Sequence, residues 1–355
     1  MSSPFLTGGR TTPVAEVVST LGGLVLGEVP ITQGHFTEQA SGSSLGRLEI
    51  TVPAVGWVPT SPRDPLAAYG QELTVRRGFR LPSGETVGWE TLTRARIQSS
   101  EPDDAWLTVV AESIDARLNP AKWIVSYRST GNVHSQVRQI CSGVVPVRLE
   151  CEAVALPNRT WEQQSSRRDA LLEVCDAAGA VPRIINGQLV VVDASTSTTP
   201  EFELRSGDGG TVVRVLPEQS TELVPNVVVA SSAPEDNAAP VSAMAVIDYG
   251  PMDWRGPYGQ VVEFFTSPLL TTQSACEGAA RTRLARKQAV RRDLTVEMVT
   301  DPRIRLDAVV RVIEEKRDTD CVMRVTSGRH ALTAGREPGS LSGVVLSGVV
   351  RGQLW

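Results

Sequence analysis

The stretch that most restricts the fold of this chain runs from 161 to 193, where a helical pattern leads directly into a hairpin pattern. Ser166 can cap a helix, and Asp169 follows three residues later, at the spacing of a capping box. Apolar residues then recur with the period of one helix face, at Leu171, Val174, Cys175 and Ala178. The sequence therefore predicts a short amphipathic helix.

A glycine and a tight turn follow this helix. Gly179 stands where a helix is commonly terminated by a residue in the left-handed conformation. The dipeptide Asn186-Gly187 separates two apolar runs, 181–185 and 188–193. Both residues of such a turn need positive φ, which makes Asn-Gly a strong hairpin signal. The predicted unit is a helix, a glycine stop and a hairpin, and its sequence contains no nucleophile, metal cluster or phosphate loop.

Long tracts on either side of this unit have β patterns. Residues 47–52 alternate between polar and apolar, as in a half-buried strand. The strands of the first tract, about 8 to 12 residues apart, suggest a small barrel or a sandwich. We expect Trp57, Trp89 and Trp106 to anchor it. The strand candidates are 24–29, 47–52, 73–79, 85–98, 105–114, 212–216, 227–230, 241–249, 260–265, 295–299, 308–314, 321–327 and 343–350.

These patterns predict a mainly β protein of the α+β class, divided into three regions. We expect a first β domain over 1–116, an α/β insert domain over 117–200, and a second β domain with one long helix over 201–355. The insert should also contain a helix at 132–142, and the long helix should span 272–291. No repeat of fixed period is visible, although the two β tracts are of comparable size.

Charge and hydropathy exclude several classes of function. The net charge is −5 and the sequence pI about 5.5, which argues against a general binder of nucleic acid or anionic membranes. No run reaches the roughly 18 apolar residues of a membrane span. We see no signal-peptide pattern at the N-terminus, so we expect synthesis and folding in the cytoplasm of the producing cell.

The cysteines indicate neither a disulfide framework nor a metal site. Their number is odd and they show no CxxC spacing; they are Cys141, Cys151, Cys175, Cys276 and Cys321. We expect free, buried thiols, and a Cys141–Cys151 bridge is the one open alternative. No cofactor is predicted.

One sequence motif and three histidines are candidates for catalytic residues. Residues 42–46 match G-x-S-x-G, but a nucleophile elbow must lead into a helix and here a strand follows. We therefore interpret Ser44 as part of a turn. His35, His134 and His330 have neither the ligand spacing of a metal site nor the order of a triad, so we expect solvated or core histidines. No catalytic residue is predicted.

Other candidates have a structural interpretation that outweighs the functional one. Glu101, Asp103 and Asp104 could bind a cation but better fit a polar loop tip, and Asp208 among glycines better fits a β-turn. A basic cluster in the long helix could bind phosphate, but we expect a solvated face or ion pairs to a neighbouring subunit. Its members are Arg281, Arg283, Arg286, Lys287, Arg291 and Arg292. The loops around Trp123 and Trp254 could be contact surfaces or core.

The last third carries a resemblance to a known family. The helical run 279–286 leads to 294–296, then to the Pro-containing segment 301–307, and then to the valine-rich run 309–312. This order resembles the end of baseplate and tail hub proteins of tailed phages, and residues 166–193 resemble the middle of the same family. Asp307 departs from the pattern, which favours glycine there. The chain also stops soon after its last strand, which we expect to leave no room for a spike, a lysozyme or a fibre-binding extension.

The resemblance implies a structural virion protein rather than an enzyme. It implies two tail-tube-like β-barrels, near 1–116 and 201–355, joined by the α/β insert. A homotrimer would then form a ring of six barrels at the virion tail tip, converting the six-fold tube into a three-fold tip. The implied partners are the tail tube or distal tail ring protein, the tape measure protein, a central fibre or spike, and DNA in transit through an acidic or neutral lumen.

Two other classes of function stay open at this stage. A tail-associated peptidase or muralytic hydrolase would need a catalytic cluster, and a multidomain adhesin or carbohydrate-binding protein would be a monomer that binds glycans. A single-barrel tube subunit is a closer variant, but the α/β insert disfavours it.

Overall fold

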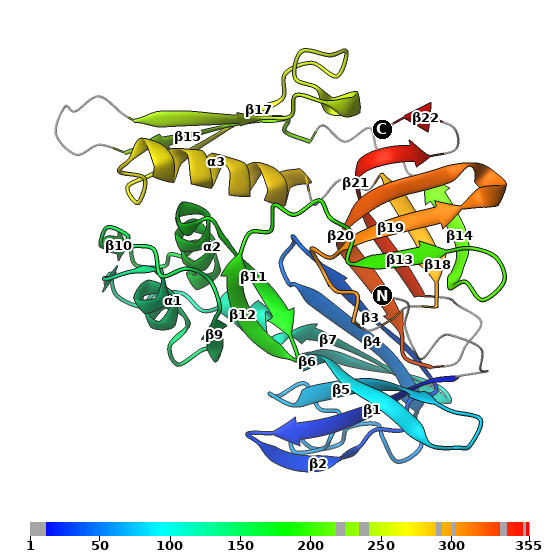
Figure 1. Cartoon of the computed structure of the whole chain (residues 1–355). Helices are drawn as coiled ribbons and strands as arrows, with labels where there is room; N and C mark the ends of the chain where they lie inside the picture. Colours follow the sequence, from blue (N-terminus) through cyan, green and yellow to red (C-terminus); the bar gives the residue numbers. More distant parts are fainter. Residues whose placement is uncertain are drawn as a thin grey trace.

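The computed structural model describes residues 12–217, 224–233, 241–288, 293–299, 301, 303–333, 339–350 and 353–354. In these ranges strands dominate, and the α-helices are α1 (Val133–Cys141), α2 (Arg167–Ala178) and α3 (Gln273–Gln288) (Figure 1). The largest sheet has 14 strands. The predicted mainly β, α+β class is confirmed. None of the helices in the described ranges is long and apolar enough to cross a membrane.

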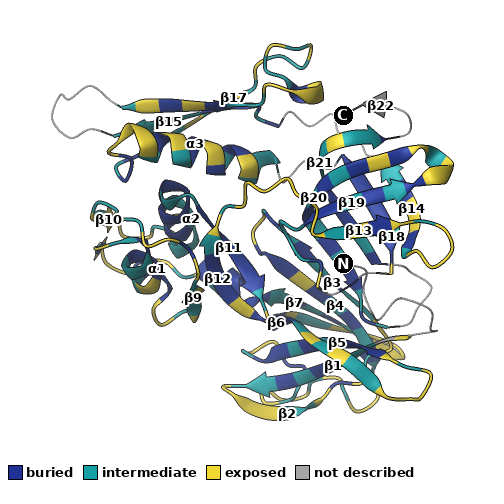
Figure 2. Cartoon of the chain, viewed as in Figure 1, coloured by how far each residue is buried: buried dark blue, intermediate teal, exposed yellow. Residues whose placement is uncertain are grey.

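The first β unit contains the strands up to residue 113. They are β1 (Thr12–Leu21), β2 (Leu24–Glu28), β3 (Gln33–Gln39), β4 (Gly46–Pro53), β5 (Glu72–Arg80), β6 (Thr86–Asp103) and β7 (Trp106–Ser113). All neighbours are antiparallel, in the order β2-β1-β5-β6-β7-β4-β3. As predicted, β4 alternates, and it turns Leu48, Ile50 and Val52 into the core. The strands curl round this one apolar core (Figure 2).

The tryptophans expected to anchor this core do not fill it. Trp106 is 47% exposed because the alternation along β7 turns its neighbour Leu107 inward. Trp89 lies under the guanidinium of Arg76, 5.2 Å from the ring centroid. Trp57 is partly buried and only packs against the core from outside. Aliphatic side chains fill the interior instead.

The second β unit comes from the last third of the chain. Its strands are β13 (Phe202–Arg205), β14 (Val212–Pro217), β18 (Leu294–Met298), β19 (Val309–Glu314), β20 (Thr319–Ala331), β21 (Gly339–Val350) and β22 (Gln353–Leu354), with the 3₁₀ turn η3 (Glu315–Arg317) between β19 and β20. They enclose a core of their own. The final strand, β22, extends the edge of β21.

Both β units have the same strand order. The second, apart from the short edge strand β22, is ordered β13-β19-β20-β21-β18-β14, and the first, apart from the hairpin strand β2, is ordered β1-β5-β6-β7-β4-β3. Numbering the six strands of each unit along the chain gives 1-4-5-6-3-2 in both cases. One difference is the direction of strand one, since β13 is parallel to β19 whereas β1 is antiparallel to β5.

The equivalence extends to individual residues. In β6 the amide of Ile97 donates to the carbonyl of Gln71, and the register to β7 shifts between Ile97 and Ser99. In β20 the amide of Val325 donates to the carbonyl of Ala308, and the register to β21 shifts just after it. A β-bulge is a specific local feature, so its recurrence aligns Ile97 with Val325.

The two units share one sheet because β3 pairs with the distal half of β20. No ladder between described strands closes either unit into a ring. A single parallel bridge, Ser206 to Val212, links the ends of β13 and β14. The units are therefore strongly curled but open in their hydrogen bonding, where the resemblance implied closed barrels.

The predicted helix, glycine stop and hairpin are confirmed between the two units. The Ser166 side chain accepts a hydrogen bond from the Asp169 amide at 3.3 Å, and Gly179 ends α2 with φ +71°. The turn at 186–187 has φ of +51° and +72°. The elements here are η1 (Ile114–Leu118), β8 (Tyr127–Ser129), β9 (Val147–Leu149), β10 (Arg159–Trp161), β11 (Ala180–Ile185) and β12 (Gln188–Asp193). The helix predicted at 132–142 is α1, while only β9 pairs as a strand within the stretch 144–156.

A second small sheet and α3 pack on this middle region rather than on the second β unit. The sheet contains β15 (Val227–Ser232), β16 (Ser242–Val246) and β17 (Val262–Ser267), and η2 (Gly250–Met252) follows β16. Its residues Val228 and Ala230 share a core with Leu171 of α2 and Leu284 of α3. The predicted end of the long helix, at 291, lies outside the described residues.

Two glycine variants should separate backbone strain from packing at the hairpin. In Gly179→Ala the new Cβ meets no atom closer than 3.9 Å. The left-handed backbone is then the only source of strain, and we expect it to lower the free energy of unfolding by about 1 kcal/mol. In Gly187→Ala the Cβ lies 3.0 Å from the Arg94 amide nitrogen of β6, and we expect a loss of about 2–3 kcal/mol. Urea denaturation measures both. Equal losses would mean that the hairpin tip does not depend on β6.

Candidate functional site

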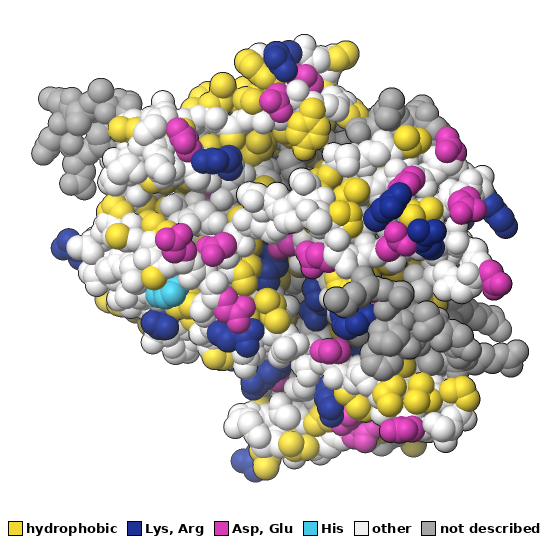
Figure 3. All heavy atoms as spheres, in the orientation of Figure 1, with side chains coloured by type: hydrophobic (Ala, Val, Ile, Leu, Met, Phe, Trp, Pro, Cys, Tyr) yellow, Lys and Arg dark blue, Asp and Glu magenta, His cyan; other side chains and the backbone are white. Residues whose placement is uncertain are grey.

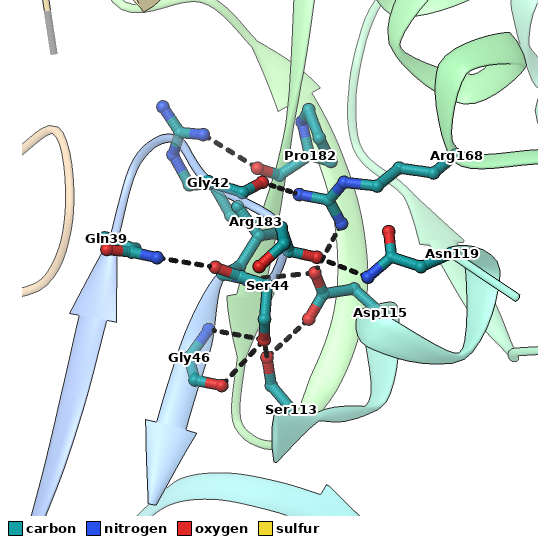
Figure 4. A network of polar contacts seen from close by, with 12 residues as sticks. Gln39, Gly42, Ser44, Gly46, Ser113, Asp115, Asn119, Arg168, Pro182 and Arg183 are labelled. Atoms are coloured by element: carbon teal, nitrogen blue, oxygen red, sulfur yellow. Dashed lines mark hydrogen bonds and ion pairs between the residues drawn. The ribbon is translucent and has the colours of Figure 1, made fainter. Parts of the chain in front are cut away.

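The G-x-S-x-G loop lies where the first β unit meets the middle region. It connects β3 to β4, and Ser44 in it is 4% exposed. The Ser44 hydroxyl lies 3.1 Å from the Ser113 hydroxyl and donates to the Gly46 carbonyl at 2.8 Å (Figure 4). Among the described residues, the hydrogen-bond partners of the Ser44 hydroxyl are Gly46 and Ser113 and include no histidine, and strand β4 follows the loop. The turn interpretation is confirmed, and this serine lacks the base that a nucleophile requires.

Asp115 of η1 is the centre of the network around this loop. Its carboxylate accepts hydrogen bonds from the Ser113 hydroxyl, from the Leu45 amide at 3.0 Å and from Arg168 of α2 at 2.9 Å (Figure 4). Arg168 also donates to the Gly42 carbonyl at 2.5 Å. Because the Asp115 side chain is 1% exposed, its charge depends on these donors. The network fixes the first β unit to α2.

A second ion pair, between a buried arginine and a partly exposed aspartate, fixes the hairpin to the second β unit. Arg183 of β11 binds Asp307 in a bidentate pair, with N–O distances of 2.5 and 2.9 Å. Asp307 has φ +68°, the left-handed conformation that favours glycine. This explains the departure at this position, because glycine would suit the backbone but would leave Arg183 without its carboxylate.

Arg305 touches all three regions of the chain. Its guanidinium donates to Glu38 of β3 at 3.0 Å, to the Leu92 carbonyl of β6 at 3.2 Å and to the Ile184 carbonyl of β11 at 3.2 Å. His330 of β20 contacts the same Glu38 carboxylate at 3.2 Å. This cluster lies on the pairing of β3 with β20, so it links the two β units through charge as well as through the backbone.

The cluster is buried, which shifts its acid–base equilibria. Burial lowers the pKa of His330, and the hydrogen bond to Glu38 only partly opposes this. Burial alone would raise the pKa of Glu38, but the Arg305 guanidinium and the His330 hydrogen bond outweigh it and hold the pKa below its ordinary value. The arrangement is therefore a carboxylate held between two positive or donating groups.

The basic cluster of α3 pairs within its own chain. Arg286 binds Asp176 of α2 at 2.6 Å, Arg283 binds Glu263 of β17 at 2.7 Å, and Lys287 binds the same glutamate at 3.0 Å. The expected solvated face is therefore wrong for these three residues, because each pairs with a carboxylate of its own chain. Arg281 is exposed and near only Glu277, and Arg291 and Arg292 lie outside the described residues.

The remaining candidates are dispersed. His134 contacts the Cys151 carbonyl at 2.8 Å and His35 lies near Arg329. Glu101 and Asp103 belong to β6, so the loop tip is shorter than predicted and begins at Asp104. Asp208 lies in an exposed turn, Trp123 is buried and stacks on Tyr127, and Trp254 is partly buried. In the described part of the chain, no group of His, Cys, Asp and Glu could hold a metal ion.

The cysteines are free and buried, as predicted. Burial raises the pKa of Cys141 and of Cys321 to about 12, which keeps both thiols protonated and unreactive near neutral pH. The alternative Cys141–Cys151 bridge is not formed.

Two adjoining cavities, of about 680 and 480 Å³, lie where the middle region meets the two β units. Both are lined by Ala40, Val181, Arg183, Arg286 and Thr326. Figure 3 shows this face hollowed near its centre, with acidic and basic side chains together there. Since Arg183 and Arg286 are already paired with carboxylates, the hollow is a junction between regions rather than a charged binding pocket.

Sequence reasoning missed the residues that hold this junction. Glu38, Arg183 and Arg305 have ordinary neighbours along the chain, and Arg305 is 267 positions away from Glu38. Asp307 was the one visible signal, because a non-glycine residue replaced an expected glycine.

Comparison with known proteins identifies relatives of the fold only. No protein-family model matches the chain, and no curated protein matches it. The tail protein from Neisseria meningitidis matches with a TM-score of 0.64 and 13% identity, over 96% of this chain and 98% of that one. The 43 kDa tail protein of prophage MuSo2 from Shewanella oneidensis matches with a TM-score of 0.61 and 16% identity, over 93% of this chain and 98% of that one. A prophage tail protein from Listeria monocytogenes matches with a TM-score of 0.53 and 10% identity, over 92% of this chain and 94% of that one. The predicted resemblance to tail proteins is confirmed in the fold.

Removing the partner of Asp115 should unfold the junction. Arg168→Met leaves a buried carboxylate without its counter-ion, so we expect the free energy of unfolding to fall by about 3 kcal/mol. The control is Arg205→Met, which breaks a pair whose side chains are 55% and 42% exposed and should cost less than about 0.5 kcal/mol. Chemical denaturation measures both, and similar losses would contradict a structural role for the network.

Acid should weaken the pairing of the two β units through His330. Its lowered pKa means that the unfolded chain takes up the proton near pH 6.5 while the folded protein resists it. The contribution to stability is therefore complete above that pH and falls below it. His330→Gln does not titrate, so its Tm should fall less than that of the wild type between about pH 7 and pH 5. His134→Gln is the control, and identical slopes for all three proteins would refute the assignment.

Proposed function

We propose that the chain is a structural protein of a phage tail, the trimeric hub at the distal end of the tail. The overall fold is that of tail proteins over more than nine-tenths of the chain. Under this proposal the two curled β units, within residues 1–116 and 201–355, take the places of two tail-tube subunits, and the α/β insert 117–200 separates them. The segment of β15–β17 and α3 packs on the insert and enlarges it.

The observation that carries the proposal is the shared 1-4-5-6-3-2 order of the two β units. One chain with two equivalent units can present two similar faces, so three chains present six. Most homo-oligomers have closed point-group symmetry, and a trimer of paired units can meet a six-fold ring on one side and a three-fold body on the other. This is what an adaptor between a tail tube and a tip needs.

The partners follow from that position. The tail tube or distal tail ring lies on one side, a central fibre or spike on the other, and the tape measure protein and then DNA pass through the lumen. A net charge of −5 suits a wall that must release DNA. The role is non-enzymatic, since the polar networks described above are used in joining regions of the chain.

A mass measurement in solution followed by low-resolution imaging tests this proposal. We expect a species of three chains of 38.1 kDa each, appearing as a ring, alone or when the tail tube protein is added. A persistent monomer that binds glycans would support the adhesin instead. Clearing of cell-wall substrate in a zymogram by the wild type, and not by Ser44→Ala, would support a hydrolase and contradict the hub.

A further inference from the structure

The small sheet that packs on α3 has an open edge at β16. Its strand order is β16-β15-β17, so β16 has one neighbouring strand among the described residues. The Ile247 amide, at the end of β16, donates to the Asn226 carbonyl at 3.0 Å. Alternate residues of an antiparallel ladder bond to the same neighbour, so the main-chain groups of Met244 and Val246 point away from β15. In the described part of the chain no hydrogen bond reaches these groups.

This open edge forms one wall of the larger cavity at the junction. Residues 243–247 all line the cavity, so the edge of the strand, and not one face alone, borders it. Residues 344–346 of β21 line it as well. A third wall is one flank of α3, whose lining residues recur every three or four positions at Gln273, Glu277, Arg281, Ala285 and Gln288. The cavity volume of about 680 Å³ falls in the range of ligand pockets, roughly 300–1,000 Å³.

An open strand edge beside a cavity selects an extended peptide. Main-chain hydrogen bonds to such an edge supply affinity, and alternate side chains supply specificity. Ala243 and Ala245 turn into the core under the sheet, whereas Met244 on the opposite face is 56% exposed. A strand added to β16 would alternate in the same way. One set of its side chains would lie beside Met244 and Val246, and the other set would point to the flank of α3.

The charges around the cavity select the second set of side chains. Four arginines and two acidic residues line the cavity. Arg281 is 69% exposed at its side chain and lies 3.7 Å from Glu277. Arg324 donates to the carbonyls of Ser195 at 2.5 Å and Ser197 at 2.6 Å, and it has no carboxylate partner among the described residues. A positive excess on this side favours acidic side chains in an incoming strand.

We propose that the β16 edge binds an extended segment of a partner protein in which apolar residues alternate with acidic ones. The segment adds a strand to the small sheet, with its apolar residues beside Met244 and Val246 and its acidic residues toward Arg281 and Arg324. The proposal goes beyond the hub function and does not depend on it, because the small sheet and α3 lie outside both β units.

A synthetic peptide tests the chemistry of the segment. The probe is a fluorescein-labelled octapeptide that alternates valine with glutamate, titrated with the full-length chain and followed by fluorescence anisotropy. We expect saturable binding. An octapeptide that alternates valine with lysine should bind at least about tenfold more weakly, because its charge is reversed. A wild type that does not bind the glutamate peptide, or that binds both peptides equally, overturns the proposal.

N-methylated peptides test the hydrogen bonds with the native chain. Methyl groups on the amides of all valines and on those of all glutamates lie on opposite edges of the added strand. One of these two peptides should therefore lose at least about tenfold in affinity, because its amides can no longer donate to β16. The other should bind like the unmodified peptide. Equal affinities of the two N-methylated peptides would show that no strand is added.

Two proline variants test which edge is used. Met244→Pro removes an amide that bonds to no described residue, so the small sheet should stay folded while the affinity for the glutamate peptide falls at least about tenfold. Phe264→Pro makes the same change at the open edge of β17, on the other side of the same sheet, and should leave the affinity unchanged. Circular dichroism verifies the fold of both variants. A loss of affinity in Phe264→Pro alone would overturn the assignment to β16.

A charge variant and a mass measurement complete the test. Arg281→Glu should weaken binding of the glutamate peptide at least about tenfold, whereas Arg205→Glu changes an exposed arginine that does not line the cavity and should have no effect. Equal effects would contradict the proposed direction of the acidic residues. An oligomer of the wild type that Met244→Pro dissociates would assign the edge to a second copy of the chain. That outcome overturns the partner segment and leaves the hub in place.

Discussion

The arrangement of this protein depends on the pairing of β3 with β20. These two strands belong to different units, and a cross-strand ladder over residues 35–39 and 327–331 makes one sheet out of two curled halves. Glu38 and His330 lie within the ladder, and Arg305 reaches the same carboxylate from the loop before β19. A buried carboxylate is unfavourable without partners, so this seam can form only when both units and the hairpin are in their final positions.

Ion pairs with at least one buried side chain recur where elements from distant parts of the chain meet. Asp115 with Arg168 joins the first β unit to α2, Arg183 with Asp307 joins the hairpin to the second β unit, and Asp176 binds arginines of α3. Such pairs add little net stability compared with apolar packing, but breaking one leaves an uncompensated charge. They therefore define the relative orientation of the elements more than they add to the free energy of folding. The polar loop that looked like a nucleophile elbow belongs to this class.

Local patterns predicted the local structure well. Ser166, Gly179 and Asn186-Gly187 each act through their own backbone, so the capped helix and the hairpin could be derived before any tertiary contact was known. The free, buried cysteines and the turn at Ser44 followed for the same reason. The positions of the tryptophans could not be derived in this way. Whether Trp106 faces inward depends on the phase of the alternation along β7 and not on the size of the side chain. The α3 arginines were also misassigned, since their carboxylates come from α2 and β17.

The amino-acid sequence by itself determined the capped helix, the glycine stop, the tight hairpin and the alternation of β4, because capping, positive φ and alternation act over a few residues. Only the tertiary structure decided that the two β tracts share one strand order, since no repeat of fixed period survives in the residues and strand order is a property of long-range pairing. It also decided which charges meet: Glu38 and Arg305 are 267 positions apart, and only the closure of the sheet brings them together. Interactions within one turn can be predicted along the chain, whereas those that join the two β units and the hairpin arise between segments that only the fold makes neighbours.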